Sequence, residues 1–262
     1  IDRCVWSQKT AKLVTDVWQS KWITDTAGVH QVSISYWETF WQRDDPNDSF
    51  DSWRHLEAQV KRLMPVLQFQ DEDIQLSEMQ HCLKTAKKGT LRGSCAFSAD
   101  ELAAMPDALL SLLLLIFNYI RSKANWPDLL VQAIVCMLAK TDEVLTPADT
   151  RPIIVLSVLY RLLTRILSAR YVKVLAANVP PEVFGFLPGK SREDIYYFIQ
   201  HAVEIALEEN HTLGRCVADL VKAFNAFPRV PLQIIANHIG IPKTEVDAYH
   251  NFLGRVSRRF RT

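Results

Sequence analysis

The sequence predicts an α+β protein that is predominantly helical and contains a small antiparallel sheet. Long segments carry apolar residues at the three- and four-residue spacing of a helix, and several begin at a recognisable cap. Two short apolar runs, 153–156 and 216–220, follow turn or proline signals and favour strands instead. Hydrophobic residues make up 48% of the 262 residues and charged residues 23%, so the chain can bury a substantial core.

The first 70 residues are rich in tryptophan and charge, and we expect a helical N-terminal extension there. Trp18 and Trp22 are four residues apart, as are Trp37 and Trp41, so each pair would share one helix face. Stacking of these rings on nucleic-acid bases is one interpretation. Packing against neighbouring helices is the interpretation that we favour.

The next segments predict helices joined by a cationic loop. Asp71 to Lys87 has helical periodicity. Two glycines stand among basic residues over 87–94, without the ending of a Walker phosphate loop. Ser98 and Glu101 form a capping box, and a long apolar helix follows over 107–123.

The middle of the chain predicts the sheet. The segment 129–138 is almost uninterruptedly apolar, which fits a short helix followed by a buried strand, and periodicity alone does not separate helix from strand here. The β-branched run 153–156 predicts a further strand. Ser157 can then cap a helix over 158–177, on which two arginines four residues apart share a face.

Prolines and glycines break the chain after that helix. The segment Gly185 to Ser191 is a turn-rich loop, and Ser191 with an acidic residue three positions later caps a helix reaching about residue 210. The remaining expected elements are a buried strand over 216–220 and helices over 232–238 and 245–255.

Positive charge concentrates in one part of a nearly neutral chain. The net charge of the whole chain is +1, yet the stretch 151–192 contains seven basic residues and one acidic residue, Glu182. Such a block indicates contact with a phosphate backbone. A solvated helix face with partners elsewhere in the fold would give the same pattern. The basic residues are Arg151, Arg161, Arg165, Arg170, Lys173, Lys190 and Arg192.

The cysteines and the longest apolar run indicate the cellular environment that we expect for the chain. Five scattered cysteines without a C-x-x-C pair indicate neither a zinc site nor a disulfide framework. Cys136 and Cys216 lie in apolar runs, and we expect buried thiols in a reducing compartment, nuclear or cytoplasmic. The apolar run 108–120 is too short to cross a bilayer, so no membrane partner is expected. The chain begins at Ile1 rather than Met, and we expect a piece of a longer protein.

The strongest chemical signal is the carboxylate of Asp219 at the end of an apolar run. Mg²⁺ prefers oxygen ligands and often shares them with substrate phosphates, so this position suits a metal ligand. The alternative is a solvent-facing aspartate at the end of a core strand. The surrounding motif is Asp-x-x-Lys-Ala-Phe, from Asp219 to Phe224.

Three motifs stand in the order and spacing of one enzyme family. Arg151-Pro152-Ile153, followed by 156–163, resembles the fingers signature of reverse transcriptases from non-LTR retrotransposons. The loop 185–191 resembles their G-F-x-x-G-R-S segment, with Lys190 in place of Arg. The motif 219–224 resembles their first palm motif.

The resemblance implies a right-hand polymerase fold, of which this chain supplies the fingers and a partial palm. It divides the chain into an N-terminal extension (1–70), a fingers region (71–210) and the start of a palm (211–262). The implied reaction is RNA-directed DNA synthesis by two Mg²⁺ ions, for which Mn²⁺ can substitute. The implied partners are an RNA template, a DNA primer and a dNTP.

The resemblance also implies roles for individual residues. Asp219 would be the catalytic metal ligand, with the Leu220 carbonyl as a second contact, and Phe224 would face the ribose. Lys140 and Arg151 would hold the triphosphate, where cationic donors neutralise charge. The expected template contacts are Arg161, Arg165, Gly185, Gly189, Lys190 and Ser191.

These roles have structural alternatives, and the match has two departures. Arg151 could pair with Asp149, Lys140 could be an exposed strand end, and Phe224 could be core. Asn225 stands where the family usually has Asp, and the family's paired-Asp turn has no counterpart in the sequence. One carboxylate cannot hold two Mg²⁺ ions, so we expect this chain alone to lack polymerase activity. The alternative function is a degenerate or domesticated module that binds RNA or protein without catalysis.

Overall fold

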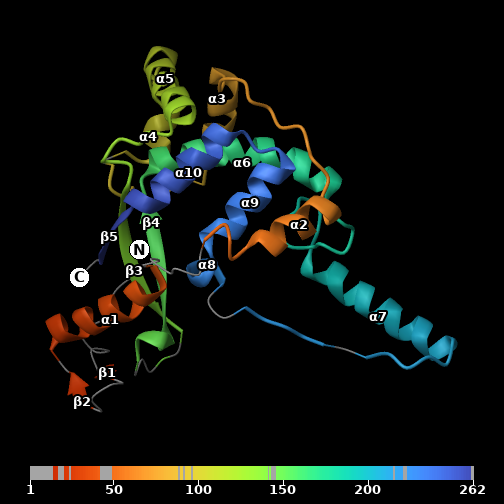
Figure 1. The fold of residues 1–262 in the computed structure, drawn as a ribbon. Helices are drawn as coiled ribbons and strands as arrows, with labels where there is room; N and C mark the ends of the chain where they lie inside the picture. Colours follow the sequence, from red (N-terminus) through yellow and green to blue (C-terminus); the bar gives the residue numbers. More distant parts are fainter. Residues whose placement is uncertain are drawn as a thin grey trace.

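The fold is α+β and mostly helical, as the sequence predicts. Figure 1 shows the helices gathered around the upper part of a small sheet, with α1 at its lower end and α7 projecting to one side. The computed structural model describes residues 14–16, 21–23, 25–41, 49–87, 89–90, 92–95, 97–140, 142, 146–214, 216–220 and 223–260.

The predicted caps at Ser98, Ser157 and Ser191 are confirmed, because each serine hydroxyl accepts a hydrogen bond from a backbone N–H of the first helical turn. The helix expected from Asp71 is shorter, because Gln75 caps it and it begins one residue later. No helix in the described ranges is long and apolar enough to cross a membrane. The helices are α1 (Thr26–Trp41), α2 (Arg54–Leu63), α3 (Leu76–Lys84), α4 (Ala99–Ala103), α5 (Asp107–Lys123), α6 (Val158–Asn178), α7 (Arg192–Glu208), α8 (Ala223–Ala226), α9 (Arg229–Ile239) and α10 (Lys243–Arg255), with a 3₁₀ turn η2 (Pro147–Asp149).

The main sheet has the strand order β4-β3-β5. β3 (Gln132–Ala139) runs antiparallel to β4 (Thr150–Leu156) and parallel to β5 (Ser257–Phe260), so the sheet is mixed rather than antiparallel as predicted. The central position of β3 explains its continuous apolar sequence, since Val135 and the predicted buried thiol Cys136 are covered on their respective faces. The short helix expected before this strand is a turn instead.

Helices α3, α5, α6 and α10 enclose the main core above the sheet. Met79, Phe117 and Leu163 are among its fully buried side chains. Figure 1 shows α6 passing behind α9 and α10 as the longest helix of this layer. The core therefore joins the middle of the chain to its last helix.

The aromatic face of α1 packs on the sheet. Trp37 is only 2% exposed and packs with Val135 and Met137 of β3. Trp37 and Trp41 stack with ring centroids 6.0 Å apart, so this pair shares a face and serves packing, as favoured. The helical prediction for Trp22 is wrong, because it lies in β2 (Lys21–Ile23), which pairs antiparallel with β1 (Val14–Asp16). Trp18 lies outside the described residues.

The end of α9 is joined to the segment after α2. The backbone N–H of Leu67 donates to the carbonyl of Ile239 at 2.8 Å. Gly240 ends α9 with φ +95°, and a Cβ there would lie 2.4 Å from the carbonyl oxygen of Leu67. Only glycine permits this approach and this backbone conformation.

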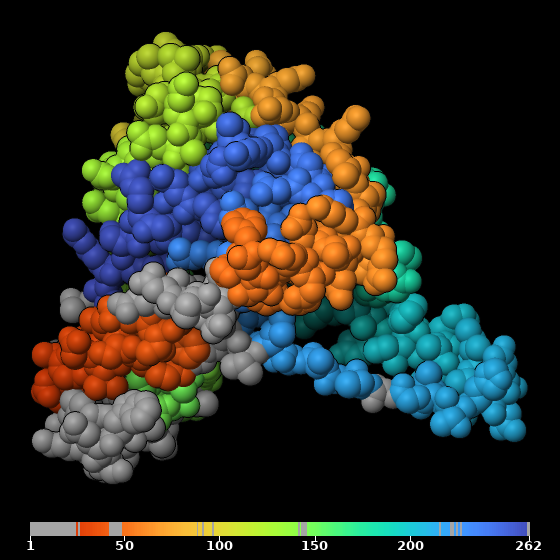
Figure 2. Space-filling model, in the orientation of Figure 1, coloured from red at the N-terminus to blue at the C-terminus, as the bar shows by residue number. Residues whose placement is uncertain are grey.

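Helix α7 and the segment after it extend away from the core. Figures 1 and 2 show α7 as an arm at the lower right, and the described residues 211–214 and 216–220 run back from it as an extended chain. The buried strand expected over 216–220 is wrong: these residues have no regular structure and are exposed, including Cys216, which we expected to be buried. No strand in the described part of the chain pairs with them, so their backbone polar groups have no ladder to enter.

Candidate functional site

The two residues expected to hold a triphosphate lie at one end of the β3–β4 ladder. Leu138 pairs with Arg151, and the backbone N–H of Lys140 donates to the carbonyl of Asp149 at 2.8 Å. Directly paired residues share a face and alternate residues return to it, so Lys140 and Arg151 are diagonal neighbours. Both are exposed. The hairpin therefore brings together two cations that the intervening loop separates in the sequence.

The turn before β4 shapes this end of the hairpin. The Asp149 carboxylate accepts hydrogen bonds from the backbone N–H of Thr146 at 2.8 Å and from its hydroxyl at 3.0 Å. The buried Thr150 hydroxyl donates to the carbonyl of Pro147 at 2.7 Å. The Lys140 ammonium also donates to the carbonyl of Ala148, so its side chain lies along the turn. These bonds fix the backbone from which Arg151 projects.

A second cluster of basic side chains lies between α3 and α6. Arg161 and Arg165 line a cavity of about 160 Å³ together with Lys87. Arg165 donates to the Thr85 carbonyl at 2.7 Å and to its hydroxyl at 3.1 Å, so it also fixes the end of α3. Burial raises the pKa of the Cys82 thiol in the same cavity, and Arg165 only partly offsets this. Cations above a small, partly apolar hollow could receive a backbone phosphate.

Two other members of the basic block are occupied by partners in the fold. Arg170 donates to both carboxylate oxygens of Glu78 at 2.7 Å, which holds the pKa of Glu78 below its ordinary value. Lys190 donates to the carbonyl of Pro181 at 3.2 Å and lies over the ring of Phe184 at 4.9 Å. Arg170 is buried and closed to a partner, whereas Lys190 is exposed and its charge stays accessible beside these two contacts.

The glycine loop expected to approach a template joins α6 to α7. Gly189 has φ +74°, whereas Gly185 has an ordinary φ, and a Cβ at either would meet no atom within 4 Å. The Ser191 hydroxyl is used in the capping box of α7 with Asp194. In this structure the loop is open, and its close approach to any strand of nucleic acid stays a prediction.

The expected metal ligand lies on the extended segment. Asp219 is exposed, as is Leu220 at 65%. The described residues contain no group of three or more His, Cys, Asp or Glu side chains that could hold a metal ion. Asp219 alone does not fit a two-Mg²⁺ centre. The side chain of Phe224 lies outside the described residues, so its ribose-facing role stays a prediction.

One contact directly after this motif was not foreseen. The side-chain carbonyl of Asn225 accepts a hydrogen bond from the indole N–H of Trp41 at 3.0 Å. The residue that departs from the family pattern thus links α8 to α1. No sequence signal connects two residues so far apart.

The expected site residues occupy separate places: the hairpin end, the α3–α6 cavity, the α6–α7 loop and the extended segment. Comparison with protein-family models and with curated protein sequences gives no match to either.

Proposed function

We propose that the chain supplies the fingers and early palm of an RNA-directed DNA polymerase of a retroelement. The observation that carries the proposal is the position of Lys140 and Arg151 at one end of the β3–β4 ladder. Two exposed cations at one end of a paired β-ladder suit the triphosphate of a dNTP, because a guanidinium can bind a phosphate through two donors. The proposed partners are a dNTP, an RNA template and a DNA primer.

The proposal also assigns template-binding and metal-binding roles. Arg161, Arg165 and Lys190 would contact the template backbone. Asp219 would be one ligand of Mg²⁺ or Mn²⁺, and the described residues offer it no companion carboxylates. DNA synthesis is therefore proposed for the family and not for this chain alone.

The proposal is tested by titrating the chain with a fluorescent dATP and with the matching monophosphate. The triphosphate should bind more tightly, and Arg151→Ala should weaken it about tenfold, the loss of one charge-assisted hydrogen-bonded contact. Lys243→Ala removes an exposed cation of α10 and serves as the matched control. Equal affinity of wild type and Arg151→Ala for the triphosphate would contradict the proposal.

The second candidate is a module that binds RNA without catalysis. Two observations favour it. Asp219 is exposed, and Asn225, which stands where the family usually has Asp, is hydrogen-bonded to Trp41 instead of being open to a metal ion. In the same titrations it predicts salt-sensitive RNA binding that Arg161→Ala weakens, together with no preference for triphosphate over monophosphate. The two candidates thus differ in a single experiment.

A further inference from the structure

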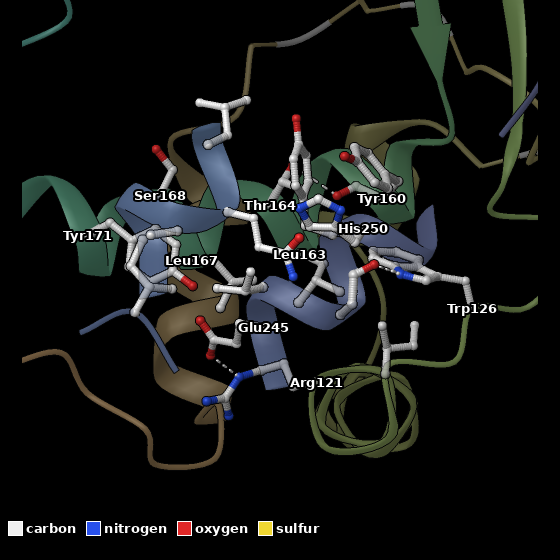
Figure 3. Close-up of a pocket in the computed structure, with 18 of the residues that line it drawn as sticks. Arg121, Trp126, Tyr160, Leu163, Thr164, Leu167, Ser168, Tyr171, Glu245 and His250 are labelled. Carbon is white, nitrogen blue, oxygen red and sulfur yellow. Dashed lines mark hydrogen bonds and ion pairs between the residues drawn. The ribbon is translucent and has the colours of Figure 1, made fainter. Parts of the chain in front are cut away.

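One hollow of the molecule lies apart from the residues assigned to nucleotide, template or metal binding. A cavity of about 460 Å³ lies between α5, α6, α9 and α10. Its walls are mainly aliphatic and aromatic. Figure 3 shows Leu163 and Leu167 along the cavity, with Glu245 and Arg121 at one end and Tyr160 and His250 at the other. This volume falls within the range of cavities that hold small molecules.

One carboxylate in this apolar cavity is incompletely satisfied. The Glu245 side chain is 2% exposed, and its Oε1 accepts from Arg121 Nε at 2.6 Å. Its Oε2 is buried and has no hydrogen-bond partner in the described part of the chain. In Figure 3 this second oxygen points away from Arg121. A buried acceptor without a donor is unfavourable, so the site is incomplete without a further group.

Three donors near Glu245 are engaged with other acceptors. Arg121 donates through its other nitrogens to the carbonyl of Glu72 at 2.8 Å and to Asp71 at 3.5 Å. The indole N–H of Trp126 donates to the carbonyl of Ala248 at 2.7 Å. The Thr164 hydroxyl bonds to carbonyls of its own helix. These three side chains are therefore committed to other acceptors, and no hydrogen bond to Glu245 Oε2 comes from any described residue.

The charge around Glu245 favours a cation. Arg121 faces three carboxylates, at 2.6 Å from Glu245, 3.5 Å from Asp71 and 3.8 Å from Asp73. The other nearby arginine, Arg170, is itself paired with Glu78. Burial raises the pKa of Glu245 more than Arg121 lowers it, so its ionised form lacks full compensation. A positively charged donor in the cavity would supply that compensation.

We propose that the cavity between α5, α6, α9 and α10 binds a small, mainly apolar molecule that carries one ammonium group. The ammonium donates to Glu245 Oε2, and the apolar body packs against Leu163 and Leu167. Aromatic rings such as Tyr171 also line the cavity and attract a cation through their faces. The proposal is independent of nucleotide or RNA binding, because it uses none of the residues assigned to them.

The test compares two probes of matched shape by calorimetric titration of the full chain. 1-Naphthylmethylamine carries the ammonium group, and 1-ethylnaphthalene has a similar body without it. The amine should bind at least tenfold more tightly. Equal affinities would overturn the role of Glu245, and no binding of either probe would overturn the site.

A pair of variants on α9 locates the binding. Ala236 lines the cavity, whereas Asn237 lies on the exposed side of the same helix. Ala236→Phe should fill the cavity and abolish binding of the amine, while Asn237→Phe should leave it unchanged. Retained binding in Ala236→Phe would contradict the proposed location.

A measurement on the unmodified chain tests the site even where Ala236→Phe fails to fold. With ¹³C-labelled glutamate, the carboxyl resonance of Glu245 should shift on addition of the amine and stay in place with the hydrocarbon. An unchanged chemical shift of this resonance on addition of the amine would overturn the proposed contact.

Discussion

Some charged residues in this chain are buried in ion pairs that stabilise the fold, whereas others are exposed and can contact a binding partner. Arg170 is buried, and it joins α6 to α3 through Glu78 and to the carbonyl of Glu72 at 2.7 Å. By contrast, Arg151 projects from a strand into solvent. Sequence counting treats the two alike, because both belong to the same basic block. Burial is what separates a structural guanidinium from a candidate ligand-binding one.

The Arg170–Glu78 pair predicts a large loss of stability on truncation. Arg170→Ala should lower the free energy of unfolding by about 3 kcal/mol, because it leaves the Glu78 carboxylate partly buried without its partner. Urea denaturation measures this loss. Lys173→Ala, at an exposed position of the same helix, should change stability little. A similar small effect of both variants would contradict the role given to Arg170.

The same pair gives a pH dependence. The pKa of Glu78 is lowered in the folded state, chiefly by its hydrogen bond to Arg170. The contribution of ionised Glu78 to the free energy of unfolding is therefore fully present above its pKa in the unfolded chain. It is lost as the pH falls through its pKa in the folded protein. The difference in stability between wild type and Arg170→Ala should shrink under acidic conditions.

At the scale of elements, the segment 216–220 shows why an apolar pattern does not make a strand. Val217 and Leu220 would suit the interior of a sheet, yet both are exposed here. A strand is stable only when neighbours pair with its backbone and cover a face. The run 153–156 has the same apolar character and does form β4, because β3 lies beside it.

This difference predicts where a protease cuts first. Val217 and Leu207 are equally exposed, at 74%, but Leu207 lies in α7 whereas Val217 lies in the extended segment. Proteases need an extended, accessible backbone, so thermolysin should cleave within 211–220 well before it cleaves in α7. Mass spectrometry of the early fragments measures this. First cleavage inside α7 or the β3–β4 hairpin would contradict the described arrangement.

For the whole molecule, local signals predicted the elements better than their assembly. Serine caps and β-branched runs act over a few residues, so Ser98, Ser157 and Ser191 could be assigned from sequence. The pairing of β5 with β3 joins distant parts of the chain, and no local pattern announces it. The mixed sheet was missed for this reason.

The same limit applies to the sites. The proximity of Lys140 and Arg151 was expected only through the family resemblance, and the hairpin supplies a physical basis for it. The Arg121–Glu245 pair and its cavity could not be foreseen, because their residues come from α5 and α10 and carry no motif. Tertiary packing, and not sequence spacing, creates that site.

Photo-crosslinking tests the proposed triphosphate site most directly. A dATP derivative with an aryl azide on its γ-phosphate reports what lies beside the end of the triphosphate. We predict crosslinks at the hairpin end around Lys140 and Arg151, removed by excess dATP and reduced in Arg151→Ala. Crosslinks confined to the α3–α6 cavity or to the α6–α7 loop, with the hairpin unlabelled, would contradict the account.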